Sequence, residues 1–290
     1  MSFDEIEKID DIDRIFIKTK KSESHYLEYK EKIVKADSVT KPIVAFANAD
    51  GGLIIIGIEE DDNHLPKEIK PVPLLDNQHT IENYILDTIQ PKFTNFRIKS
   101  ILGEEKDSGV LLVEVNKGLN TPYMASNHVH YVRREKKSES MTELEIREAI
   151  FRKGLKDALY VELKSNLGYS KNITKQNQAL HESTRDKNEG PPDPNKLHIR
   201  TAIIPFRTEA WRAIVSSGLF SIIQEKYETL IELYNLISEF NFLAEYLKFD
   251  IRRVQTQEEN HHEHLINKLQ AKNTHIFTKL SESLKIFEKK

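Results

Sequence analysis

The sequence contains no cysteine among its 290 residues. Disulfide bonds, zinc sites built on thiolates and cysteine nucleophiles are therefore all excluded. Long apolar runs are also missing, because no stretch approaches the ~20 residues that a helix needs to span a membrane. The first residues, MSFDEIEKID, are acidic and lack the basic and apolar regions of a signal peptide. We therefore expect a cytoplasmic protein that has no membrane partner.

An excess of positive charge is missing as well. The formal net charge is −3, which argues against a general polyanion binder. Residues 1–150 carry 21 Lys and Arg against 28 Asp and Glu, and residues 151–290 carry 22 against 18. Neither half is strongly basic, so a nucleic-acid surface has to be local. Acidic residues clustered beside such a surface would have a separate task, and holding a divalent metal is one.

The first half of the chain alternates strand and helix patterns. Strands are predicted from alternating or continuous apolar residues, at 25–31, 53–60, 96–102, 110–115 and 128–135. Helices are predicted from Asp37 or Ser38 to the glycine pair at 51–52, with Pro42 near the first turn, and over 80–91 with Thr80 as the cap. This order predicts an α+β fold, a mixed sheet of about five strands flanked by helices.

The second half reads as helical. A capping box, Thr142 with Glu145, starts a helix, and long helical patterns follow from Thr208 onward. In the last of them, Leu265, Leu269, Leu280 and Leu284 recur on one helical face. We place the boundary between a first domain, residues 1–155, and a helical C-terminal region, residues 156–290. That region contains a polar, Pro-rich loop near 183–196 and one short strand-like stretch, LHIRTAII, at 197–204.

The stretch ESHYLEYKEK carries the chemistry of the first domain. Glu28 and Lys30 are two residues apart on a predicted strand, so their side chains share one face. An acid-x-Lys pair of this kind recurs in metal-dependent nucleases, and a further carboxylate would come from Glu59 or Glu60 at the end of the apolar strand. From the spacing alone, a surface ion pair is the simpler explanation, because short motifs often match by chance.

Three motifs in order resemble the Schlafen family core, the AlbA-type domain. These are ESHYLEYKE, then AFANADGGLIIIGIEEDD, then HYVRRE followed by a helix, and they cover residues 20–150. The resemblance implies a nuclease with three acidic active-site residues, which fall here on Glu23, Glu28 and Glu60. Glu60 departs from the aspartate that is usual in the family. Lys30 would contact phosphate.

The function implied is a metal-dependent endoribonuclease that uses Mg²⁺ or Mn²⁺. Its substrate would be structured RNA such as tRNA or rRNA, with single-stranded or duplex DNA as another substrate. The basic run after the last strand adds candidate nucleic-acid contacts, and two lysines near the N-terminus join the same patch: Arg133, Arg134, Lys136, Lys137, Lys20 and Lys21. A solvated strand end explains the basic run equally well.

Two other functions stay open at this stage. A non-catalytic DNA- or RNA-binding regulator is the main alternative, although three acids facing phosphate favour the enzyme. A nucleotide-binding domain is disfavoured, because the sequence has no G-x-x-x-x-G-K-[ST] motif. Vertebrate Schlafen cores pair two related lobes around RNA and this chain has one, so we expect a homodimer whose interface is built by the helical region.

Overall fold

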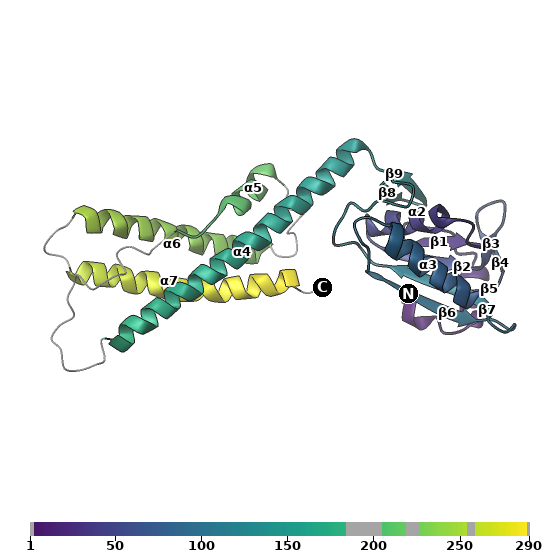
Figure 1. Cartoon of the computed structure of the whole chain (residues 1–290), viewed down its shortest axis with the longest axis horizontal. Coiled ribbons are helices and arrows are strands. Elements are labelled where there is room, and N and C mark those ends of the chain that lie inside the picture. The colour runs from purple at the N-terminus through teal and green to yellow at the C-terminus, as the bar shows by residue number, and fades with distance from the viewer. Residues whose placement is uncertain (1–2, 184–204, 219–226, 254–258, 289–290) are drawn as a thin grey trace. The chain divides into compact units, whose positions relative to one another are not determined.

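The structure of the chain, a computed structural model, describes residues 3–183, 205–218, 227–253 and 259–288 (Figure 1). Contacts within the chain divide it into two units, Met1–Lys153 and Gly154–Lys290. Residues 184–196 of the predicted polar loop lie outside the described residues, and so does the strand-like stretch 197–204. Among the residues described, no helix is long and apolar enough to cross a membrane.

The first unit is built on a five-stranded mixed sheet. Its strands are β1 (Leu27–Lys30), β2 (Gly52–Ile56), β5 (Val72–Pro73), β6 (Phe96–Leu102) and β7 (Ser108–Val115). The order is β1-β2-β7-β5, and β6 also pairs with β7. β1 runs parallel to β2, whereas β2, β5 and β6 are all antiparallel to β7. The predicted hairpin of β6 and β7 is thus present, and β1 forms one edge of the sheet.

Both faces of this sheet are covered, which explains why β2 is a continuous apolar run. Helices α2 (Ala36–Ala47) and α3 (Leu74–Thr88) pack on one face around Ile54, Ile56 and Val113. The N-terminal segments η1 (Phe3–Glu5), α1 (Ile9–Ile12) and η2 (Asp13–Ile17) pack on the other face, around Tyr29 and Ile55. Every second side chain of β1 is therefore directed toward α2.

The predicted strand 53–60 is divided in two by Gly57. β2 ends at Ile56, and β3 (Ile58–Glu60) pairs with β4 (Pro66–Ile69) in a separate two-stranded sheet. Gly57 has φ +109°, and a Cβ there would lie 3.1 Å from the carbonyl oxygen of Lys70. This backbone conformation is rare for residues with a side chain. The apolar pattern was read correctly as buried, but the change of direction depends on one glycine within it.

The strand predicted at 128–135 does not join the main sheet. Its observed part, β8 (Tyr131–Arg134), forms a hairpin with β9 (Lys137–Ser140). The AFAN motif ties this hairpin to α2. The Asn48 side chain donates to the carbonyl oxygens of Tyr123 and Tyr131, both at 2.8 Å, and accepts the Tyr123 N–H at 2.7 Å. A single amide side chain thus fixes where β8 starts.

Two helices begin earlier than their sequences predicted. α2 starts at Ala36, and Ser38 lies inside its first turn, where its hydroxyl accepts the Lys35 N–H at 3.3 Å. Pro42 consequently lies in the helix interior and not near the first turn. α3 starts at Leu74, so Thr80 is an interior residue whose hydroxyl donates to the Asp76 carbonyl. Ser38 thus caps from the third helical position, by accepting the N–H of the N-cap residue Lys35, whereas Thr80 bonds to the preceding turn inside its helix.

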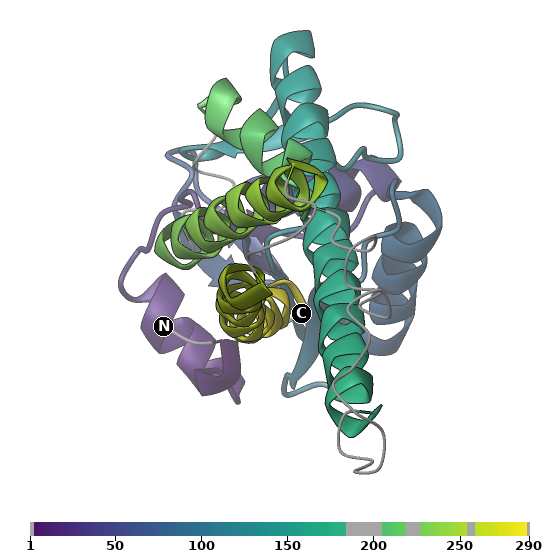
Figure 2. The same ribbon diagram turned by 90° about the vertical axis from the view of Figure 1, so that its left-hand side faces the viewer.

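The second unit is helical, as predicted. Its helices are α4 (Glu143–Ser183), which begins within the first unit, α5 (Glu209–Ser217), α6 (Tyr227–Arg253) and α7 (Glu259–Glu288). The capping box of α4 is present, with Thr142 N–H to Glu145 Oε2 at 2.7 Å and Glu145 N–H to Thr142 Oγ1 at 3.3 Å. Figures 1 and 2 show α6 and α7 side by side, with α4 crossing them. The predicted leucine stripe of α7 is buried in their common core. The α+β class with a helical C-terminal part is confirmed.

Candidate functional site

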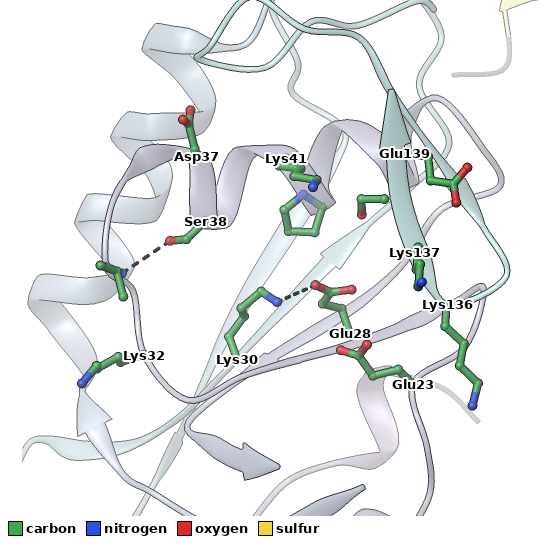
Figure 3. Close-up of a pocket in the computed structure, with 13 residues that line it drawn as sticks. Glu23, Glu28, Lys30, Lys32, Asp37, Ser38, Lys41, Lys136, Lys137 and Glu139 are labelled. Atoms are coloured by element: carbon green, nitrogen blue, oxygen red, sulfur yellow. Dashed lines mark hydrogen bonds and ion pairs between the residues drawn. The ribbon is translucent and has the colours of Figure 1, made fainter. Parts of the chain in front are cut away.

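The edge strand β1 places Glu28 and Lys30 on the face of the sheet that α2 covers. Glu28 stands opposite Ile54 of β2, whereas Tyr29 points to the other face and is fully buried. Glu23 precedes the strand, and its Oε1 accepts the backbone N–H of Tyr29 at 2.8 Å. Glu23 is thereby held beside the strand that carries Glu28. Figure 3 shows the two carboxylates lying next to each other.

Two cations hold the Glu28 carboxylate. Lys30 Nζ lies 2.5 Å from Oε1, and the Arg133 guanidinium donates to Oε2. The Arg133 side chain is 0% exposed. It also donates to the carbonyl oxygens of Ser24 and Leu27, both at 2.9 Å, and stacks on the Phe46 ring at 4.9 Å. The structure therefore corrects the interpretation of Arg133 as a phosphate contact. Its guanidinium is an interior group that fixes Glu28 and the turn before β1.

Glu60 ends β3 next to a register shift in its pairing with β4. Its Oε1 is buried and has no hydrogen-bond partner within the described residues. Burial raises the pKa of the Glu60 carboxyl. Glu59 differs, because it faces the exposed hairpin and makes ion pairs with Lys67 at 3.0 Å and Lys70 at 3.2 Å. Of the two acids at this strand end, Glu60 is the one that remains available to a ligand.

The three predicted acids influence one another electrostatically. The pKa of Glu23 is raised to about 7, chiefly by burial and then by the negative charges of Glu28 and Glu60, although the Tyr29 N–H and Lys30 act to lower it. The Tyr29 pKa is also raised, by burial and then by the charges of Glu23 and Glu60. Carboxylates raise one another's pKa in this way only when they lie close together. The structure thus brings Glu23, Glu28 and Glu60 into mutual influence.

Mutual influence does not amount to a formed metal centre. Within the part of the chain that the structure describes, no three His, Cys, Asp or Glu side chains are gathered closely enough to hold a metal ion. The donor chemistry nevertheless fits Mg²⁺ or Mn²⁺, which prefer carboxylate oxygens and retain several waters. A buried carboxylate oxygen without a donor, as in Glu60, is costly unless a cation or a donor satisfies it.

Glu23 and Glu28 line a pocket of about 540 Å³ (Figure 3). Helix α2 contributes Asp37, Ser38, Lys41 and Pro42, and the β8–β9 hairpin contributes Lys136, Lys137, Ser138 and Glu139. The remaining lining residues follow from β1 into α2: Lys30, Lys32 and Val34. Glu60 is not among the lining residues.

The predicted basic contacts fall in different places. Lys136 and Lys137 line the pocket, whereas Lys20, Lys21 and Arg134 do not. Lys21 lies over the Phe16 ring at 5.5 Å. Arg134 makes ion pairs with Glu139 at 2.9 Å and with Glu145.

Sequence reasoning missed two lysines of the pocket, Lys32 and Lys41. Lys32 could have been found from its spacing, because it continues the series Glu28, Lys30, Lys32 at steps of two. Lys41 carries a weaker signal, one helical turn after Asp37 on the predicted helix. That this helix stands over β1 is decided only by the tertiary fold.

Comparisons with known proteins assign a family to the segment that contains these residues. The family model described as "Schlafen, AlbA_2" matches residues 23–142, which begin at Glu23 and end at the cap of α4. A search of curated proteins found no match. Among solved structures, the DIP2311 protein from Corynebacterium diphtheriae is similar at 19% identity with a TM-score of 0.30. The match covers 43% of this chain and 23% of that one. The segment that carries the carboxylates and the lysine-lined pocket is a Schlafen domain of the AlbA_2 type.

Proposed function

We propose that the first unit is a divalent-metal-dependent endonuclease that cleaves structured RNA such as tRNA or rRNA. The Schlafen domain gives the chain a nucleic-acid-related function. The observation that carries the proposal is the buried Glu60 oxygen, which lacks a hydrogen-bond donor in the described structure and lies near two further carboxylates. A hard cation bound by Glu23, Glu28 and Glu60 would satisfy that oxygen.

Mg²⁺ or Mn²⁺ bound at this site would supply charge stabilisation at the scissile phosphate and an activated water. The residues of the chain have separate tasks. Arg133 and Lys30 hold the Glu28 carboxylate in one orientation. Lys30 is 30% exposed at its side chain and lines the pocket, so it also reaches a bound phosphate.

The other predicted basic residues are ranked by their positions. Lys136 and Lys137 are well placed for phosphate, because they are exposed and line the pocket. The pKa of Asp61, which follows Glu60, is lowered mainly by hydrogen bonds from the backbone N–H groups of Leu65 and Asn63, and the charge of Lys20 adds to this effect. Lys20 and Lys21 remain candidate contacts for the part of the substrate beyond the pocket. Arg134 would have to leave its ion pairs with Glu139 and Glu145 to bind phosphate.

A homodimer is part of the proposal. One lobe offers one wall to a large RNA, and a second copy of the chain would supply the other, with the helical unit forming the interface. Light scattering at micromolar concentration should give twice the mass of 33.7 kDa. A monomer under these conditions would remove the dimer from the proposal and leave the site unaffected.

A non-catalytic nucleic-acid-binding regulator is the second candidate, and one observation favours it. Both oxygens of Glu28 are already engaged, by Lys30 and by Arg133. A site built only to bind phosphate would keep Glu28 in this state and would never draw it toward a cation. The two candidates therefore differ in whether Glu28 and Glu60 are needed for a metal-dependent reaction.

The test is RNA cleavage by the full chain in Mn²⁺, Mg²⁺ or EDTA, compared among wild type, Glu28→Gln and Glu60→Gln. Glu59→Gln is the matched control, because it removes the same charge from the neighbouring residue, whose partners are Lys67 and Lys70. We expect cleavage by wild type and Glu59→Gln in metal alone, and a loss of roughly 100-fold or more in the other two variants, as for removal of a key transition-state group.

A second measurement does not depend on activity. Mn²⁺ should raise the melting temperature of wild type and Glu59→Gln, because a ligand that binds only the folded state stabilises it. It should leave Glu60→Gln unchanged. RNA binding without cleavage and without a Mn²⁺ shift would refute the enzyme and support the regulator.

A further inference from the structure

We propose that the pocket binds a polynucleotide backbone on both sides of Glu28, with Lys32 and Lys41 as one phosphate-binding wall and Lys136 and Lys137 as the other. The inference rests on the proposed nucleic-acid function, but it does not depend on cleavage. It adds Lys32, on the β1–α2 connection, and Lys41, on α2, to the basic residues that the sequence predicted as nucleic-acid contacts. It also specifies what the pocket recognises, namely successive phosphates.

The four lysines share an absence of ionic partners. Across the residues that the structure describes, none of them makes an ion pair, in contrast to Lys30 in the same pocket. Lys41 stands over the Tyr131 ring at 5.1 Å, a contact that holds the ammonium without neutralising it. Lys32, Lys136 and Lys137 are exposed. Four ammonium groups without counter-charges around one pocket attract a polyanion.

The carboxylates of the same pocket are compensated from inside the protein. Each has a donor or cation supplied by the fold: Glu23 from the Tyr29 N–H, Glu28 from Lys30 and Arg133, Asp37 from the Ser126 hydroxyl, and Glu139 from Arg134. Two of these partners, Arg133 and Arg134, are arginines that do not line the pocket. Cations neutralise only Glu28 and Glu139, but the lining carries five lysines against four acidic residues, so the pocket presents positive charge to a ligand.

The two lysine pairs approach from different elements. Figure 3 shows Lys32 on the connection before α2 and Lys136 and Lys137 on the β8–β9 hairpin, with the carboxylates of Glu23 and Glu28 between them and Lys41 of α2 above these carboxylates. A ligand that contacts Lys32 and the hairpin lysines together has to pass over the carboxylates. The ligand that fits is a chain with phosphates at several positions, whose backbone passes over Glu28. This is the arrangement that an endonuclease requires, since the substrate continues on both sides of the cleaved bond.

The lining also indicates what is not recognised. Of the described residues that line the pocket, none is aromatic and none is an arginine. Stacking on aromatic rings and bidentate contacts from Arg are the common means of reading bases. Lysine acts on phosphate as a point charge. We therefore infer that binding in this pocket is independent of base sequence.

The experiment measures binding of a fluorescein-labelled 20-nucleotide RNA hairpin to the full chain by anisotropy, in EDTA so that no metal-dependent cleavage occurs. Three double variants are compared with wild type: Lys32→Ala with Lys41→Ala, Lys136→Ala with Lys137→Ala, and Lys92→Ala with Lys106→Ala. The last pair is the matched control, because it removes two lysines that do not line the pocket. Circular dichroism confirms that all variants are folded.

Salt dependence gives the expected magnitudes. With a slope of about 0.7–0.9 per phosphate contact, four contacts weaken binding roughly 50–150-fold between 50 and 200 mM NaCl. Each wall variant loses two of these four contacts, so its affinity should fall roughly 7–12-fold less than that of wild type over the same range. The control should behave as wild type, and hairpins of unrelated sequence should bind within about twofold of each other, since sequence-specific contacts would add far more.

Three outcomes would overturn the inference: the Lys32 and Lys41 variant keeps the wild-type salt slope, the control loses as much as the wall variants, or adenosine monophosphate competes as well as the hairpin. Failure of the proposed enzyme looks different. In that case the wall variants still lose affinity in EDTA, while wild type shows no cleavage when Mn²⁺ is added.

Discussion

Replacing Arg133 by leucine tests the structural account of the site most directly. The guanidinium is 0% exposed, and the variant leaves Glu28, itself 8% exposed, without its interior partner. Removing one member of a buried ion pair typically costs 3–5 kcal/mol. Glu28 keeps Lys30, which moderates the loss, but the carbonyl oxygens of Ser24 and Leu27 also lose their donor. We expect the first unit to lose about 3–4 kcal/mol in free energy of unfolding.

The assay is urea unfolding of the full chain, followed in two ways. Circular dichroism at 222 nm reports on both units, whereas fluorescence of Trp211, the one tryptophan, reports on the second unit. The first transition seen by circular dichroism should move to lower urea, and its melting temperature should fall by roughly 10 °C. The fluorescence transition should move less, because Arg133 belongs to the first unit.

A double-mutant cycle isolates the pair. Arg133→Leu combined with Glu28→Leu removes both charges, so no unpaired charge is left in the interior. The double variant should be more stable than the sum of the single effects predicts, with a coupling of about 2 kcal/mol or more. The reasoning is refuted if Arg133→Leu costs less than about 1 kcal/mol, since an exposed pair contributes no more than that. Additive single effects would refute it equally.

Three further predictions concern other parts of the fold. The pKa of Glu23 is raised to about 7 in the folded chain, chiefly by burial, so its ionisation destabilises the fold as pH rises from about 4.5 to 7. Glu23→Gln should therefore have a free energy of unfolding about 1–2 kcal/mol higher than wild type at pH 8, after allowance for solvent screening. Urea melts that show no such gain at pH 4 would agree with this reasoning, whereas a gain that is independent of pH would contradict it. Gly57→Ala places a side chain at φ +109°, and thermal melts should show a loss of about 1–3 kcal/mol, whereas wild-type stability would contradict the strained conformation. Tyr234→Phe removes the hydroxyl that donates to the buried Glu162, and it should lower the free energy of unfolding by about 1–2 kcal/mol. The change should be seen in the fluorescence of Trp211, whose ring stacks on Tyr234 at 4.7 Å. An unchanged urea midpoint would show that the hydroxyl does not stabilise the second unit.

Local patterns in the sequence predicted which faces are buried. Alternation in YLEYK correctly assigned Glu28 and Lys30 to one face and Tyr29 to the other, because a strand has a period of two whatever surrounds it. The capping box of Thr142 and Glu145 was equally readable, since its two hydrogen bonds join residues three apart. The predicted α+β class followed from such local signals.

Arg133 shows where local patterns fail. In the sequence it belongs to the basic run YVRREKK, and the same alternation does not say whether its face meets water or protein. Its partner, Glu28, lies 105 residues away along the chain. Only the hairpin of β8 and β9, placed against α2, buries the guanidinium under the edge strand. Lys136 and Lys137, at the end of the run, are exposed.

By itself, the sequence determined the resemblance to the Schlafen family and the α+β class, because residue periodicity and short motifs are local properties. The tertiary structure decided which charges are neutralised and which line the pocket. Arginine burial, the Glu60 oxygen without a donor and the two lysine walls all depend on segments brought together from distant parts of the chain. The electrostatic environment of a side chain depends on its distance from other charges and on the exclusion of water, and neither follows from the order of the residues along the chain.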